Sequence, residues 1–281
     1  MTIANLNIIG ESINDSVPST REFFDAGDID SIKLLAKSQE EGNAAYIDVN
    51  VGGRSPDFFV TIIREIQKAT RKPLSIDSPD PILAEAALQA YDDSIGKPIL
   101  NSISPLRLEM FDLYKLKHFR PILLISESKH GACRTAEETY EAARLMLSEA
   151  KRVGIPNDDL IFDPGIAPIG SDSEGNLVRL MAALKMIHED NEFNGFHASV
   201  GLSNFTVMLP PKRKIDGKPV KSHLESAFLT RAMPLGLDYV VGSVKRNYVL
   251  LPEGDHALVC IDECLQTTGF DSIMRVRKFY K

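Results

Sequence analysis

The sequence lacks an excess of positive charge. Its 281 residues carry 32 Lys and Arg against 39 Asp and Glu, which gives a formal net charge of −7 at pH 7. Proteins that bind nucleic acids usually present a clustered basic face, so this balance argues against that class. With 43% hydrophobic and 25% charged residues, the composition is that of a globular protein rather than a disordered one.

Cysteines and long apolar runs are also scarce. The chain has only three cysteines, Cys133, Cys260 and Cys264, an odd number that does not suit a disulfide-built secreted scaffold. It contains no run of about 18 apolar residues of the kind that crosses a membrane. The first residues, MTIANLNIIGESIN, lack the basic flank and long apolar region of a secretory signal. We therefore predict a cytoplasmic protein.

Two common phosphate-binding loops, G-x-G-x-x-G and G-x-x-x-x-G-K-[ST], are absent as well. What the chain has instead is a regular alternation of short apolar runs with longer amphipathic stretches. The runs predicted as strands are 7–10, 46–51, 74–77, 99–102, 122–126, 160–163, 198–202 and 239–241. Runs this short and this continuously apolar are typical of strands buried on both faces of a parallel sheet.

This alternation predicts an α/β fold, a single (β/α)8 TIM barrel. Because no Pro/Ser-rich linker interrupts the chain, we expect residues 1–281 to form one domain. An open, doubly wound sheet is the alternative, although such sheets usually hold nucleotide phosphates through the loops that are missing here.

Local signals place several helix ends. A capping residue followed by proline predicts a helix start, and this pattern occurs at Ser55-Pro56, Asp80-Pro81 and Ser104-Pro105. Reciprocal capping boxes are expected at Thr135 with Glu138 and at Ser222 with Glu225. Glycines suited to left-handed helix ends are Gly154 and Gly236, while Pro234 predicts a kink.

Polar residues gather where the predicted strands end, which in a barrel is the active-site mouth. They are Glu11, Asn14, Asp48, Asn50, Asp77, Ser78, Asn101, Ser102, Ser126, Glu127, Asp163, Ser203 and Asn204. Carboxylates accept hydrogen bonds and carboxamides both donate and accept, so this set suits the edge of a neutral heterocycle such as a pterin or purine. Simple capping and turn roles are the alternative. They explain least well Asp77, Asn101 and Asp163, which end apolar strands.

Six motifs in order carry a family resemblance. They are IIGESIN (8–14), IDVNVGG (47–53), IDSPDP (76–81), ILNSIS (99–104), FDPGI (162–166) and GLSNF (201–205). With them the sequence resembles the pterin-binding methyltransferases, which exchange a methyl group between a tetrahydrofolate-type pterin and a corrinoid protein. Dihydropteroate synthases share the barrel and the DPG turn, whereas GESIN and GLSN favour the methyltetrahydrofolate:corrinoid group.

The resemblance implies roles for individual residues. It implies that Asp77, Asn101 and Asp163 bind the pterin ring. It also implies that Asn204 lies near N5 of the pterin as a catalytic residue. The remaining positions that it places near the pocket are Gly201, Ser203, Glu11, Asn14 and Asn50. Asn204 would donate a hydrogen bond that strengthens as charge develops at N5, and Asp77 would hold a water network that moves the proton.

The resemblance also implies tetrahydrofolate or methyltetrahydrofolate as substrate, a corrinoid (cobalamin) carried by a partner protein, and a homodimer. We expect the corrinoid on a separate chain, because 281 residues leave little room for a second domain beside a barrel. Two positions depart from the family pattern. Val207 stands where close relatives have a glutamine, and the loop after the fifth strand reads SESKHG.

Two alternative functions are also compatible with the sequence. A dihydropteroate synthase-like enzyme, which joins a pterin diphosphate to p-aminobenzoate, would use Lys and Arg after the seventh and eighth strands. Lys245 and Arg246 lie after the eighth. A non-catalytic pterin-binding subunit would bind folate without turnover. A bound metal is not expected, because His130 and Cys133 lack the local spacing and the further ligand of a zinc site.

One loop inverts the overall charge. Residues 205–221 contain five cations against the single acid Asp216, a local charge of +4. The cations are Lys212, Arg213, Lys214, Lys218 and Lys221. One interpretation is a lid that attracts the carboxylates of a folate tail or an acidic partner protein. The alternative is a solvated loop without a partner.

Overall fold

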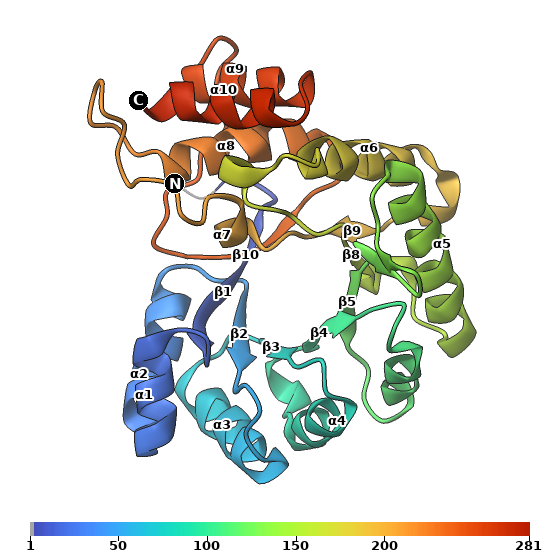
Figure 1. Cartoon of the computed structure of the whole chain (residues 1–281). Helices are drawn as coiled ribbons and strands as arrows, with labels where there is room; N and C mark the ends of the chain where they lie inside the picture. Colours follow the sequence, from blue (N-terminus) through green and yellow to red (C-terminus); the bar gives the residue numbers. More distant parts are fainter. Residues whose placement is uncertain (1–2) are drawn as a thin grey trace.

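Eight parallel strands form one closed sheet in the computed structural model, which describes residues 3–281. Their order is β10-β1-β2-β3-β4-β5-β8-β9. Figure 1 shows them as a ring with the helices outside. The strands are β1 (Asn7–Asn14), β2 (Tyr46–Asn50), β3 (Leu74–Asp77), β4 (Ile99–Ile103), β5 (Arg120–Leu124), β8 (Ile161–Asp163), β9 (His197–Ala198) and β10 (Tyr239–Gly242).

The seam between the first and last strands of this order is closed by two single bridges. Ala198 pairs with Leu237 and Gly201 pairs with Val241, both in parallel orientation. The predicted (β/α)8 barrel is therefore confirmed, and the open doubly wound sheet is wrong. Strand β9 is shorter than the predicted run 198–202, because the chain turns into helix α7 at Leu202.

Ten α-helices surround the strands in the described part of the chain. They are α1 (Pro18–Ala26), α2 (Ile29–Glu41), α3 (Pro56–Ala69), α4 (Pro81–Ala90), α5 (Ala136–Val153), α6 (Asn176–Glu189), α7 (Leu202–Phe205), α8 (Lys221–Ala232), α9 (His256–Leu265) and α10 (Phe270–Tyr280). Short 3₁₀ helices span Asp93–Ile95, Leu108–Lys115, Asn157–Asp159, Ile169–Ser171, Asn191–Phe193 and Met233–Leu235. A small hairpin of β6 (Glu127–Ser128) and β7 (Gly131–Ala132) follows β5.

Most predicted helix ends are confirmed by their hydrogen bonds. The side chain of Ser55 accepts from the Phe58 amide, and that of Asp80 accepts from the Ile82 amide. Thr135 and Glu138 form the reciprocal capping box, and Gly154 ends α5 in the left-handed region with φ 82°. These local interactions satisfy backbone groups that the first and last helical turns leave open.

Two predicted helix starts are wrong. Ser104 closes a turn instead, with its hydroxyl accepting from the Leu106 amide at 3.3 Å, and a 3₁₀ helix follows. Ser222 lies inside α8, which begins at Lys221 without a side-chain cap. Its expected partner Glu225 is fully buried and bonds to other elements, so it is not available as a cap.

Pro234 ends α8 rather than kinking it. The α-helix stops at Ala232, and Met233–Leu235 continues as a 3₁₀ helix. Gly236 then turns the chain in the left-handed region with φ 95°, as predicted. A proline inside the last turn removes a helical N–H donor, which explains this stop.

The hydrophobic core has three parts. A small cluster fills the inside of the barrel and consists of Ile9, Ile99, Ile122, Ile161 and Tyr239. Two larger clusters lie between the sheet and the helices, and each fully buried aliphatic side chain in them contributes about 1.5–3 kcal/mol. Within residues 3–281, no helix is both long enough and apolar enough to span a membrane.

Candidate active site at the carboxyl ends of the strands

Five polar side chains from neighbouring strands form a hydrogen-bonded network. Asn50 Nδ2 on β2 donates to Asp77 Oδ2 on β3 at 2.9 Å. Asn101 Nδ2 on β4 donates to Asp48 Oδ1 at 3.4 Å, and Ser75 Oγ donates to the same oxygen at 2.6 Å. The register sets Asp77 beside Asn101 on adjacent strands. The structure thus brings together Asn50, Asp77 and Asn101.

The two carboxyl groups of this network share a burial cost. Burial raises the pKa of Asp48 well above its ordinary value, and the nearby charge of Asp77 raises it further. Burial also raises the pKa of Asp77, while hydrogen bonds from Asn50 and Asp48 act in the opposite direction. We therefore assign the proton to Asp48 and the ionised carboxylate to Asp77. The pair presents one negative charge and accepting oxygens.

Asp163 at the end of β8 is a second buried acid. Burial raises the pKa of Asp163 to about 6, although hydrogen bonds oppose this shift. Its Oδ1 accepts from the Gly165 amide at 2.8 Å, and its Oδ2 accepts from Ser199 Oγ at 3.3 Å. The buried Arg179 on α6 supports the same turn, because its Nη2 donates to the Gly165 carbonyl at 3.3 Å.

The wall across the barrel from β3 and β4 is the seam between β9 and β10. Here Ser203 Oγ donates to the Glu11 carboxylate on β1. Asn204 is exposed, and its backbone amide donates to the Gly201 carbonyl at 2.9 Å. A Cβ on Gly201 would lie only 2.9 Å from Asn204 Nδ2, so glycine makes room for the carboxamide.

Asn14 and Asn50 also fix local turns. Asn14 Oδ1 accepts from the Ser16 amide at 2.8 Å, and Asn50 Oδ1 accepts from the Gly52 amide at 2.8 Å. Within residues 3–281, the side chain of Asn14 makes only this hydrogen bond to the Ser16 amide. Asn50 has both a turn role and a link to Asp77.

Sequence reasoning placed Asp48 among the polar strand ends but did not select it as a site residue. The alternation of a strand was the available signal, since Asp48 and Asn50 are two residues apart and share one face. The same spacing relates Ser75 to Asp77. Ser199 and Arg179 gave no comparable signal, because their contacts with the turn at Asp163 depend on tertiary packing.

The basic loop is an ordered hairpin beside α10. Lys212 and Pro219 form an antiparallel bridge, and the Lys214 amide donates to the Tyr280 carbonyl at 3.0 Å. Arg213 lies 4.7 Å above the Phe279 ring and also pairs with Asp216. One of the five cations is therefore engaged in holding the hairpin to α10.

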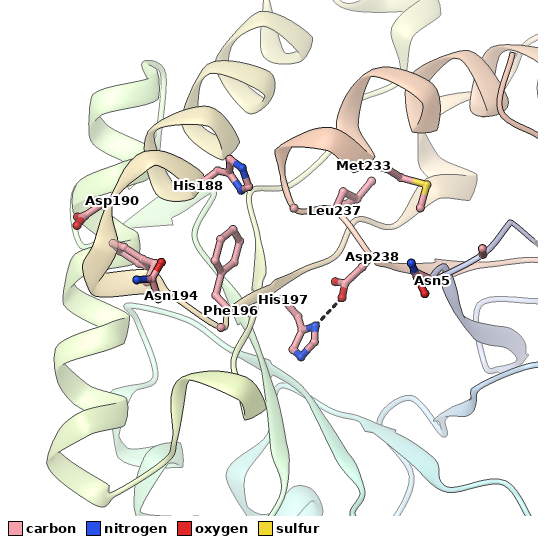
Figure 2. Close-up of a pocket in the computed structure, with 13 residues that line it drawn as sticks. Asn5, His188, Asp190, Asn194, Phe196, His197, Met233, Leu237 and Asp238 are labelled. Carbon is pink, nitrogen blue, oxygen red and sulfur yellow. Dashed lines mark hydrogen bonds and ion pairs between the residues drawn. The ribbon is translucent and has the colours of Figure 1, made fainter. Parts of the chain in front are cut away.

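A cavity of about 510 Å³ lies at the opposite, amino-terminal end of the strands. Figure 2 shows His197 and Asp238 paired there. His197 Nδ1 and Asp238 Oδ2 are 2.5 Å apart. His197 Nε2 lies 3.1 Å from Arg120 Nη2, and since arginine only donates, we assign the proton to Nδ1. The side chains of His197, Asp238 and Arg120 thus hydrogen-bond to one another. They lie at the amino-terminal end of the barrel, where residues usually contribute to stability.

No group of three potential metal-binding residues occurs within the described residues 3–281. The thiols weighed as zinc ligands are all free and buried. Cys260 and Cys264 lie one turn apart on α9, while Cys133 lies beyond the small hairpin after β5.

Residues 23–241 match the pterin binding enzyme family, and the chain belongs to this family. It is 26% identical over 245 residues to the methylcorrinoid:tetrahydrofolate methyltransferase of Eubacterium limosum, an alignment that covers 83% of each chain. Its fold is similar to the crystal structure of 7,8-dihydropteroate synthase from Vibrio fischeri ES114, with a TM-score of 0.61 and 15% identity. That similarity covers 95% of this chain and 96% of the other.

Proposed function

We propose that this protein transfers a methyl group between N5 of tetrahydrofolate and the cobalt of a separate corrinoid protein. The observation that carries the proposal is the position of the coupled Asp48–Asp77 acid pair across the barrel from the exposed side chain of Asn204. The similarity to a methylcorrinoid:tetrahydrofolate methyltransferase supports the choice of reaction. We further propose that residues 1–281 act as one domain, in the cytoplasm, where free thiols such as Cys133 persist.

Side chains from two parts of the barrel mouth would hold the pterin ring. Asp77 and Asp163 supply accepting oxygens for its N–H groups, and Asn101 supplies both a donor and an acceptor. Asp48 supports them by keeping its proton between itself and Asp77. Glu11, Asn14 and Asn50 would line or brace the pocket, with Gly201 and Ser203 on the wall of Asn204.

The chemistry requires little more than orientation and proton handling. In the direction that forms methyltetrahydrofolate, N5 bonds to the methyl carbon while the carbon–cobalt bond breaks. The cobalt keeps the electron pair and becomes Co(I), and N5 loses its proton. Asn204 would hydrogen-bond N5, and water held by the Asp77 carboxylate would take the proton. In reverse, the same groups would protonate N5 as the methyl group leaves.

The dihydropteroate synthase-like alternative needs free cations for a diphosphate. Of the two candidates after β10, Arg246 is already paired with the buried Glu225 carboxylate and donates to Thr206 Oγ1 at 3.2 Å. A cation engaged in this way is a poor diphosphate ligand, which counts against the alternative.

A spectrophotometric assay with methyltetrahydrofolate and free cob(I)alamin tests the proposal. We expect methylcobalamin to form, and isothermal titration calorimetry to show folate binding to the same protein. Folate binding without methyl transfer to cob(I)alamin, and without transfer in the reverse direction from methylcobalamin, would contradict the proposed reaction and favour a non-catalytic pterin-binding subunit.

A further inference from the structure

An ion pair between a buried acid and a partly exposed arginine links three segments next to Asn204. Glu225 on α8 is fully buried and pairs with Arg246, which follows β10. Thr206 donates its hydroxyl hydrogen to the Glu225 carboxylate and accepts from Arg246 Nη1 at 3.2 Å. The three side chains form a closed triangle of contacts around the Thr206 hydroxyl.

The position of this triangle in the chain gives it a function. Thr206 comes directly after α7, two residues beyond Asn204, and it is fully buried. The next two side chains are 42% exposed at Val207 and 93% exposed at Met208. Thr206 is therefore fixed by packing, whereas the two residues that follow it lie at the surface.

Asn204 has little else to fix its carboxamide. Within residues 3–281 its side chain makes no hydrogen bond, so its place depends on the backbone of α7. That backbone is held at one end by the bridge between Gly201 and Val241, and at the other by Thr206. The short helix is thus fixed from both sides of Asn204.

We infer that Thr206, held by Glu225 and Arg246, is a positioning residue for Asn204. This inference rests on the proposed methyl transfer. The buried Thr206 hydroxyl is engaged by Glu225 and Arg246, and it would act on Asn204 through the backbone of α7. The Glu225 carboxylate is costly to bury, and removal of Arg246 would leave its charge uncompensated. The hydroxyl of Thr206 is the member that can be removed while both charges keep each other.

The inference predicts a specific kinetic pattern. Thr206→Val keeps the shape and the ion pair but removes the hydroxyl, so the α7 end loses its anchor. A displacement of a reacting group by about 1 Å can lower a rate by about 100-fold, and we expect a decrease of about tenfold or more in the methyl-transfer rate constant. Pterin affinity should change by less than about threefold, because Asp77 and Asp163 lie on other strands.

Five variants, including Thr206→Val, test this pattern with methyltetrahydrofolate and free cob(I)alamin. Thr206→Ser restores the hydroxyl and should recover most of the lost rate. Thr61→Val, on the exposed face of α3, is the matched control for the exchange itself. In an Asn204→Ala background, Thr206→Val should have little further effect, because coupled residues give non-additive changes.

The outcomes distinguish a failure of the positioning role of Thr206 from a failure of the proposed methyl transfer. If the wild-type protein is active, an unchanged methyl-transfer rate in Thr206→Val overturns the positioning role alone. So does a double variant whose rate loss is the product of the losses in Thr206→Val and Asn204→Ala. Equal losses in pterin affinity and rate would also overturn it, since they would indicate general damage to the fold. A wild-type protein without methyl transfer overturns the proposed function and this inference with it.

Discussion

Asn50 on β2 donates a 2.9 Å hydrogen bond to the Asp77 carboxylate on β3 while its own carboxamide oxygen accepts from the Gly52 amide. One side chain thus ties a turn after β2 to the acid at the end of the next strand. The bond lowers the pKa of Asp77 against the opposing effect of burial. Asp77 depends on this neighbour to remain a ready acceptor.

Replacing Asn50 with Leu should therefore weaken pterin binding. The loss of a hydrogen bond to a buried group costs about 1–3 kcal/mol, which corresponds to a decrease in affinity of about five- to 150-fold. Titration calorimetry at pH 7 measures this change, and Asn247→Leu, at an exposed position, is the control. Unchanged affinity in Asn50→Leu would remove the proposed brace.

Pterin binding should depend on pH through Asp163. Burial raises the pKa of this carboxyl to about 6, and only its ionised form offers full accepting capacity to an N–H donor. We expect the affinity to fall as the pH drops below about 6. The Asp163→Asn variant should bind more weakly at pH 7.5 and lose this dependence. A variant with the same pH profile as the wild type would assign the titration to another group.

The same acid should make the ligand-free protein less stable as the pH rises. Its pKa is higher in the folded state than the ordinary value of 3.8, so the folded state binds the proton more tightly. This contribution to the free energy of unfolding is present below about pH 4 and is lost as the pH rises through about 6. Asp163→Asn keeps an oxygen for the Gly165 amide and should therefore melt at a higher temperature than the wild type at pH 7.5. A lower melting temperature would contradict this account.

Asn204→Ala should lower the methyl-transfer rate by about 100-fold, the usual effect of removing one hydrogen bond to developing charge. Because the side chain makes no hydrogen bond to the described residues, its removal should disturb the fold little. Pterin affinity should fall by a much smaller factor. Stopped-flow measurement with free cob(I)alamin gives the rate, with Asn191→Ala as an exposed control. An unchanged rate would show that Asn204 is not catalytic.

Local patterns were sufficient to predict the barrel. The eight apolar runs, such as ILNS at 99–102, form the eight strands because each is short, buried on both faces and followed by a capped helix or a turn. The predicted polar ends of β2, β3 and β4 meet in one network, since adjacent parallel strands end at the same edge. Neither result needs knowledge of distant contacts.

Features that depend on distant contacts were not predicted. Ser222 and Glu225 have the spacing of a capping box, but Glu225 bonds to Thr206, 19 residues earlier, and to Arg246, 21 residues later. The buried proton on Asp48 likewise depends on Asp77 from another strand. A single sequence does not show whether a carboxylate will bond to a nearby backbone amide or to a side chain that is distant in the sequence.

The seam of the barrel has a consequence for motion. Strands β9 and β10 meet through two isolated bridges, whereas β2 and β3 pair over three successive residues. Local opening should cost the least free energy at this seam, so its amides should exchange with solvent faster than those of β3. Asn204 lies beside the seam and Asp77 lies across the barrel from it. Because Thr206 anchors α7 on the other side of Asn204, the short helix stays attached at one end when the seam opens.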